Sequence, residues 1–97
     1  MTQADKVFAT LDKQGYINNL QAFKMYILRL GAVIYDMKCL GFKIEGCYGK
    51  HITNLSPKMR DKYKKVYFYF RQDNIKKDNK GEITLKKFIW DIHKLYF

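Results

Sequence analysis

The sequence predicts an α+β domain in which three helices are followed by a β-hairpin and by an extra C-terminal helix. Over residues 2–41 the apolar side chains recur at the spacing of amphipathic helices. From Phe42 they alternate with polar ones, which indicates strands, and the helical spacing returns after residue 84. A chain of 97 residues has room for one such core.

The first helix is expected over residues 3–13. Thr2 and Asp5 have the spacing of a capping box, in which each side chain accepts a hydrogen bond from the other residue's backbone. The apolar positions behind this cap have helical spacing: Ala4, Val7, Phe8 and Leu11. Gly15 is expected to end the helix, because glycine readily adopts the left-handed conformation of a C-terminal cap. Residues 16–17 then form a short extended piece.

A second capping pattern, Asn18 followed by Gln21, predicts the start of the second helix. Its apolar residues are Leu20, Phe23 and Met25. After a break at residues 26–27, a third helix is expected to end at Gly41. Four apolar residues recur on one of its faces: Leu30, Ile34, Met37 and Leu40. Two short helices separated by a tight break form a helix-turn-helix arrangement.

Two antiparallel strands are expected next, joined by a long basic loop. The first begins at Phe42, and the second covers residues 66–70, where apolar residues alternate with tyrosines. Residues 47–62 contain the single proline and several turn-forming residues, so they are expected to form the loop. Three tyrosines near the second strand are expected to pack on the sheet, with stacking on single-stranded bases as the alternative: Tyr63, Tyr67 and Tyr69.

The last part of the chain is predicted to be a linker and a helix. Residues 72–81 are polar, and Thr84 is expected to cap a helix that runs to the C-terminus. The domain division expected from this is a folded unit over residues 1–72, with the linker and amphipathic helix over residues 73–97. The apolar stripe of this helix, which includes Phe88 and Ile92, is wide enough to dock on the first helix of the same chain. Trp90 and Phe97 lie off the stripe and predict a homodimer, whose expected interface is Phe88, Trp90, Ile92 and Phe97.

Positive charge is concentrated in the centre of the sequence. The chain has a formal net charge of +10, and residues 50–72 contain seven basic residues and one acidic residue. Concentrated positive charge attracts polyanions, of which nucleic acid is the most common in cells. A solvated lysine-rich loop is the alternative explanation.

Three stretches of the first half carry a resemblance to a known family. They are TQADKV, which begins at Thr2, then INNLQAF, and RLGAVIYDMKCLGF, which ends at Phe42. With the residues between them they resemble the small winged helix-turn-helix domains of bacteriophages and prophages. The resemblance covers residues 2–48, with a weaker match at residues 63–70. It implies three helices with a β-hairpin wing, and binding to double-stranded DNA.

The sequence departs from this family at three positions of the helix-turn-helix. Family members tend to have glycine in the turn, threonine as the cap of the third helix and arginine in its middle. This chain has Tyr26, Leu28 and Val33 there. Leu28 has no side-chain oxygen to cap a helix, and Val33 cannot read guanine edges. Base recognition is therefore expected to depend on few residues.

The expected DNA-binding residues fall into two groups. The third helix is expected to enter the major groove and contribute Arg29, Tyr35 and Lys38. The wing is expected to contact phosphates through six cations: Lys50, Lys58, Arg60, Lys62, Lys64 and Lys65.

Several classes of function find no support in the residues. Catalysis is not expected, because the chain has a single serine, no glycine-rich phosphate loop and no paired carboxylates on one helix face. No cofactor and no metal site are expected, since the two cysteines and two histidines lack a metal-binding spacing. Without an apolar run long enough for a membrane span, or a signal peptide, we expect a cytoplasmic protein of a bacterial host cell.

These observations predict a sequence-preferring double-stranded DNA-binding protein, a phage or prophage transcription regulator. One alternative is a phage-encoded inhibitor that binds a host protein or nucleoprotein complex through its basic face. The other is an accessory or excision-type architectural factor that binds DNA within a larger assembly. A regulator would protect a short palindrome, whereas an inhibitor would show no sequence preference.

Overall fold

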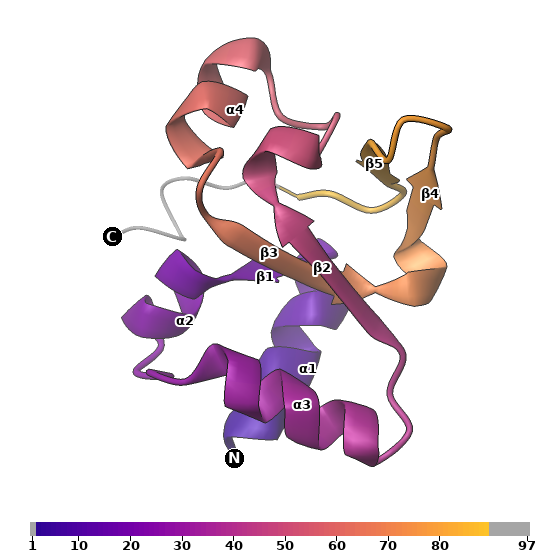
Figure 1. Ribbon diagram of the computed structural model, residues 1–97. Helices are drawn as coiled ribbons and strands as arrows, with labels where there is room; N and C mark the ends of the chain where they lie inside the picture. Colours follow the sequence, from indigo (N-terminus) through magenta and orange to yellow (C-terminus); the bar gives the residue numbers. More distant parts are fainter. Residues whose placement is uncertain (1, 90–97) are drawn as a thin grey trace.

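The computed structural model describes residues 2–89 of the chain. The first part contains three helices and a short strand, in the order α1 (Gln3–Gln14), β1 (Ile17–Asn18), α2 (Asn19–Lys24) and α3 (Leu30–Cys39) (Figure 1). Two longer strands follow, β2 (Ile44–Tyr48) and β3 (Tyr67–Arg71). The α+β class and the order of helices and strands up to β2 are confirmed.

Local capping signals determine where the first two helices begin. Thr2 and Asp5 exchange both capping-box hydrogen bonds, each 3.1 Å long. Asn18 and Gln21 exchange the equivalent pair at 2.8 and 3.1 Å. Gly15 ends α1 with a φ of 91°, and a Cβ at this position would overlap a backbone carbonyl of residue 87. All three predictions about helix ends are confirmed.

The helices enclose a first core on one face of a three-stranded sheet. Its buried residues are Val7, Leu11, Ile17, Ala22, Ile27, Leu30, Ile34, Met37 and Ile44. Three of the four apolar positions expected on one face of α3 are among them. Leu40 is not, because it follows the last turn of α3 and is 77% exposed.

The sheet is antiparallel with the strand order β1–β3–β2. Along β3 the side chains alternate between two packed faces. Tyr69 packs against the first core, whereas Phe68 and Phe70 are fully buried on the opposite side. The central strand therefore joins two cores.

The expected loop over residues 47–62 is wrong, since most of this segment is folded. It completes β2 and then forms a short 3-10 helix, η1 (Gly49–His51), and a further helix, α4 (Pro57–Tyr63). Ser56 caps α4 by accepting a hydrogen bond from the backbone N–H of Met59, and Pro57 occupies the first turn, where its missing N–H costs nothing. Serine and proline are thus helix-start signals here.

The expected linker and C-terminal helix are also corrected. Residues 72–85 form a 3-10 helix, η2 (Gln72–Asn74), and a hairpin of β4 (Ile75–Lys77) and β5 (Ile83–Leu85). Residues 86–89 are not helical, and residues 90–97 lie outside the described part. The side chain of Asn54 bonds both the N–H and the C=O of Leu85, at 2.7 and 3.1 Å, which holds β5 extended.

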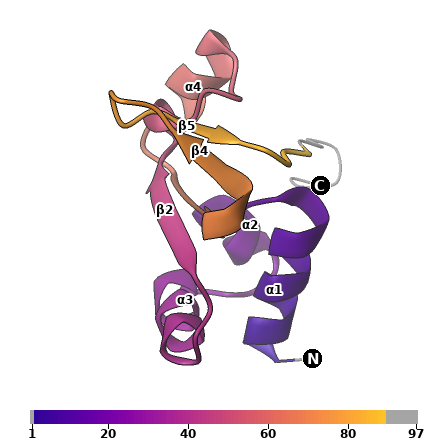
Figure 2. The ribbon, with the colours of Figure 1, turned by 90° about the vertical axis from the view of Figure 1, so that its right-hand side faces the viewer.

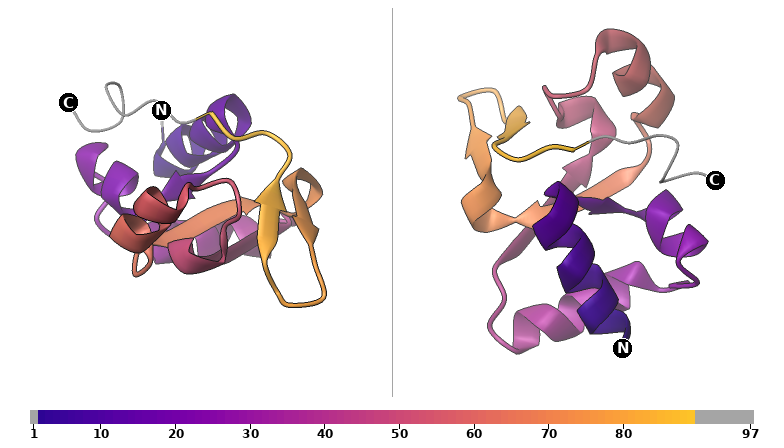
Figure 3. Two further views of the ribbon diagram at one scale, coloured as in Figure 1. Left: turned by 90° about the horizontal axis from the view of Figure 1, so that it is seen from above. Right: turned by 180° about the vertical axis from the view of Figure 1, so that it is seen from behind.

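These later elements build a second core on the other face of the sheet. It contains Tyr16, Ile52, Leu55, Tyr63, Phe68, Phe70, Ile83 and Leu85. Figures 1 and 2 show α1, α2 and α3 on one side of the sheet, with α4 and the β4–β5 hairpin on the other. The view from behind in Figure 3 shows the same division. Within residues 2–89, no helix is long and apolar enough to cross a membrane.

Candidate nucleic-acid interface

The three residues expected to read DNA are all exposed on or beside α3. Tyr35 and Lys38 are three positions apart and therefore share one side of the helix. Arg29 precedes the helix as its N-cap and makes no side-chain capping bond. It lies about 14 Å along the helix from Lys38. The structure thus brings Tyr35 and Lys38 together and places Arg29 at the opposite end.

The turn before α3 keeps a left-handed residue although glycine is absent. Tyr26 has a φ of 62° and is 87% exposed. The turn closes through a 2.8 Å hydrogen bond from the N–H of Ile27 to the carbonyl of Ala22. The N-cap is Arg29 rather than Leu28, so the expected cap position is wrong by one residue. Val33 packs half-buried against the first core.

A row of three tyrosines covers the sheet between α3 and η1. The ring centroids of Tyr48 and Tyr67 are 5.0 Å apart, as are those of Tyr67 and Tyr69. Gly46 makes room for them, because a Cβ there would lie 2.5 Å from the Tyr67 ring. A Cβ at Gly31 of α3 would lie 3.5 Å from the Tyr69 hydroxyl, so the row reaches α3.

This row partly agrees with the sequence expectation. Tyr67 and Tyr69 pack on the sheet as expected, and burial raises the pKa of the Tyr69 hydroxyl above its ordinary value. Tyr63 is not beside them, because it ends α4 and is buried in the second core. Tyr48 is 47% exposed and was not expected at all. Tyr48 lies two positions after Gly46 on β2, so the period of a strand could have placed both residues on one face of the sheet.

The wing cations surround α4 instead of lining a loop. Lys58 and Lys62 are four positions apart and share one side of the helix, and Arg60 and Lys64 share another. Arg60 and Lys64 meet Lys50 of η1 in a pocket of about 290 Å³, which Pro57 and Asp61 also line. The expected phosphate-binding group therefore divides between two sides of α4.

Arg60 is the most constrained of these cations. One of its terminal nitrogens, Nη2, donates a 3.4 Å hydrogen bond to the backbone carbonyl of Leu55. Its Nε is buried and has no hydrogen-bond partner within the described residues. A buried donor without a partner is costly.

Few carboxylates neutralise this basic surface. Over residues 2–89, Lys64 is the one expected wing cation that has a carboxylate partner, Asp61 at 3.4 Å. The ammonium of Lys62 lies 5.6 Å from the centre of the Tyr63 ring. Within residues 2–89, the other five cations have no carboxylate partner.

Of the residues expected at the dimer interface, the structure describes Phe88. Phe88 stacks on Tyr16 of its own chain, with ring centroids 4.9 Å apart and 20° between the ring planes. It also packs half-buried against the second core. Trp90, Ile92 and Phe97 lie outside the described residues.

Three helices beside a three-stranded antiparallel sheet, with a helix-turn-helix leading into β2, define the class of fold. Residues 2–58 match the family model described as the winged helix-turn-helix domain, and the chain belongs to this family. Members of this family are typically DNA-binding modules without enzymatic activity. No curated protein and no solved structure matches the chain. The family expected from the sequence is thereby confirmed.

Proposed function

We propose that this protein binds double-stranded DNA with a sequence preference and regulates transcription in a phage or prophage. The observation that carries the proposal is the group of cations on η1 and α4, of which all but Lys64 lack a carboxylate partner in the described part of the chain. Phosphates are the complementary partner, because neutralising them releases counterions and strengthens binding.

The spacing of the two exposed surfaces supports binding to one duplex. Strand β2 has five residues and is about 17 Å long; residues 40–43 join it to α3, and η1 follows it directly. Half a turn of B-DNA also measures about 17 Å, which separates a major groove from the next minor groove. In this arrangement α3 lies in the major groove, and the cations of α4 contact the neighbouring backbone.

The charge distribution supports different tasks for the two helices. Within α3, Lys38 is offset by Asp36, so this helix has no net charge. The α4 cations then supply most of the affinity, and Arg29 and Tyr35 supply the preference for particular bases. A protein of this kind binds many duplexes moderately and its preferred site more tightly.

Selection of binding sites from random duplexes, followed by a salt titration, tests the proposal. We expect an enriched sequence and a slope of log affinity against log salt of about −4 to −5, for roughly four to six phosphates. A slope near zero would remove DNA as the partner. Regulation is tested separately, with a reporter gene placed behind the selected site.

One observation favours a second candidate, an inhibitor that binds a host protein. Tyr26 and Leu28 are 87% and 75% exposed at the turn that precedes α3. Exposed apolar side chains on a helix-turn-helix suit a protein surface better than phosphates. In this candidate the turn contacts the host protein in place of the basic face expected from the sequence. It predicts no enriched DNA sequence, and a host complex that Tyr26→Asp disrupts and Lys62→Glu leaves intact.

A further inference from the structure

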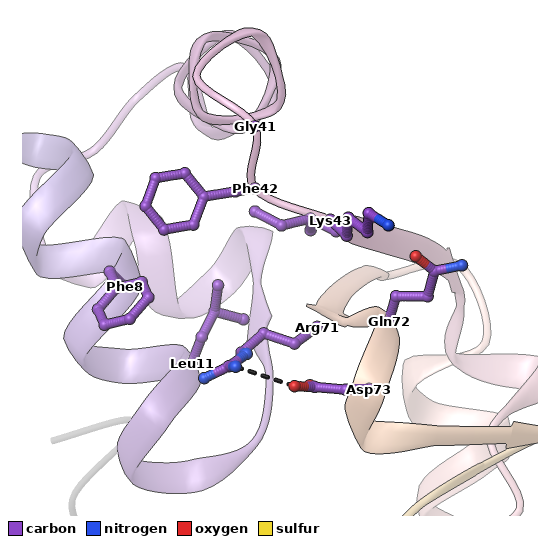
Figure 4. A pocket seen from close by; sticks show the side chains of 9 residues that line it. Phe8, Leu11, Gly41, Phe42, Lys43, Arg71, Gln72 and Asp73 are labelled. Atoms are coloured by element: carbon purple, nitrogen blue, oxygen red, sulfur yellow. Dashed lines mark hydrogen bonds and ion pairs between the residues drawn. The ribbon is translucent and has the colours of Figure 1, made fainter.

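A larger pocket lies on a different part of the molecule from the α4 surface. It has a volume of about 580 Å³ and is formed by α1, by residues 41–44 and by residues 71–73. Figure 4 shows Phe8 and Phe42 on one side of the pocket and Lys43 and Gln72 on the other, with Arg71 extending across it beside Leu11. The pocket shares no lining residue with the basic pocket of α4.

One part of the pocket lining is apolar and aromatic. Leu11 and Ile44 are buried in the first core and form part of the lining. Phe8 and Phe42 meet edge to face, with ring centroids 5.5 Å apart, and are 39% and 41% exposed. Partly exposed rings beside a buried apolar surface offer a flat ligand ring both burial and aromatic contacts.

The two cations that line the pocket, Arg71 and Lys43, differ in whether they have partners. Arg71 is paired with Asp73 at 2.9 Å and with Asp12 at 3.8 Å. Its guanidinium also lies 5.9 Å from the centre of the Phe8 ring. The ammonium of Lys43 has no ion pair or hydrogen bond with any residue from 2 to 89. Lys43 is therefore the cation that an anionic ligand would meet.

The pocket walls are held in place by backbone hydrogen bonds. The N–H of Phe42 donates to the carbonyl of Met37 at 3.1 Å, and the N–H of Gln72 donates to the carbonyl of Lys43 at 3.0 Å. Ile44 pairs with Arg71 in the sheet. A preformed site pays little ordering cost when a ligand binds.

We propose that this pocket binds a planar aromatic carboxylate with one or two fused rings. The ring lies against Phe8 and Phe42, and the carboxylate pairs with Lys43. The volume falls within the range of small-molecule sites, roughly 300–1,000 Å³. This activity is separate from the proposed DNA binding, because the two surfaces share no residue.

Titration of the full chain with naphthoate, and with its neutral amide, tests the proposal by backbone amide NMR shifts. We expect shifts at residues 41–44 and 71–73 at millimolar naphthoate, and about tenfold weaker binding of the amide. Lys43→Gln should abolish the preference for the carboxylate while leaving the amide's affinity unchanged. Lys38→Gln, which removes an exposed lysine outside the pocket, should retain the preference.

Three results would overturn the proposal. One is the absence of shifts at the pocket residues, and another is an equal effect of the Lys38 and Lys43 variants. The third is a set of naphthoate shifts that gathers around α4, which would indicate attraction by charge alone. Phe8→Leu, which keeps an apolar wall without an aromatic ring, should weaken both probes similarly, and unchanged affinities in this variant would likewise contradict the proposal.

Discussion

Helices α3 and α4 lie at opposite ends of β2 and present contrasting surfaces (Figure 1). Helix α3 carries one cation and one anion, whereas residues 57–65 carry five cations and one anion. If one surface supplied both the affinity for DNA and the recognition of bases, the positive charge would be concentrated on α3. Under the proposed function, this contrast separates affinity for a polyanion from recognition of particular groups.

The two helices also differ in how they are stabilised. Helix α3 buries Leu30, Ile34 and Met37 in the first core. Helix α4 has seven residues and buries Tyr63 in the second core, with Met59 partly buried beside it. Helices this short are unstable alone, so α4 depends on the second core for its existence. The basic surface therefore depends on the elements that follow β3.

The largest expected effect comes from reversing charges beside α4. Replacing Lys62, Lys64 and Lys65 together by glutamate should make the salt slope shallower by about three and reduce DNA affinity at least about a hundredfold at low salt. All three side chains are exposed, so folding should persist, which circular dichroism can check.

A matched control for that variant changes the same net charge elsewhere. Three exposed lysines of the hairpin region serve for this purpose: Lys76, Lys80 and Lys86. Their replacement by glutamate should have a much smaller effect on the slope. Equal losses in the two triple variants would show that net charge, and not the α4 surface, attracts DNA.

Arg29→Ala tests whether the residues at α3 recognise particular bases. We expect a loss of about 1–3 kcal/mol on the selected site and little change on unrelated duplexes, because a base contact contributes only where the base is correct. Lys24→Ala removes an exposed cation at the end of α2 and serves as the control. A uniform loss on all duplexes would mean that Arg29 contacts phosphate.

Alkylation of Cys39 reports whether α3 is covered by DNA. Cys39 is exposed on α3, whereas burial raises the pKa of Cys47 to about 11 and keeps it a thiol near neutral pH. Cys39 should therefore react with an alkylating reagent, and Cys47 should not. When about nine-tenths of the protein is bound to the selected duplex, its rate should fall about tenfold. An unchanged rate under saturation would place α3 outside the interface.

The smallest expected effect concerns the stability of the turn before α3. Tyr26→Gly should raise the free energy of unfolding by about 0.5–1 kcal/mol, because the left-handed conformation costs a side chain more than glycine. Tyr35→Gly, at an exposed position within α3, should lower it by about 0.5–1 kcal/mol. Denaturant unfolding measures both free energies. Destabilisation by Tyr26→Gly would contradict the inference that the left-handed backbone at Tyr26 is strained.

Much of the candidate site could be predicted as a set of residues but not as an arrangement. The cations of residues 50–65 are evident in the sequence, since charge is visible without structure. Their division between two sides of α4 requires knowing that this segment is helical. The pocket beside Phe8 could not be predicted, because Phe42 and Arg71 reach it from segments far apart in the chain.

The sequence by itself determined the first half of this protein, from α1 to the start of β2. Its helix ends depend on contacts three or four residues apart, as in the capping boxes of Thr2 and Asn18. Only the tertiary structure decided α4 and the β4–β5 hairpin. The N–H of Thr53 donates to the carbonyl of Ile83 at 2.8 Å, thirty residues away. Short elements of this kind become stable only when distant segments satisfy their hydrogen bonds and bury their apolar side chains.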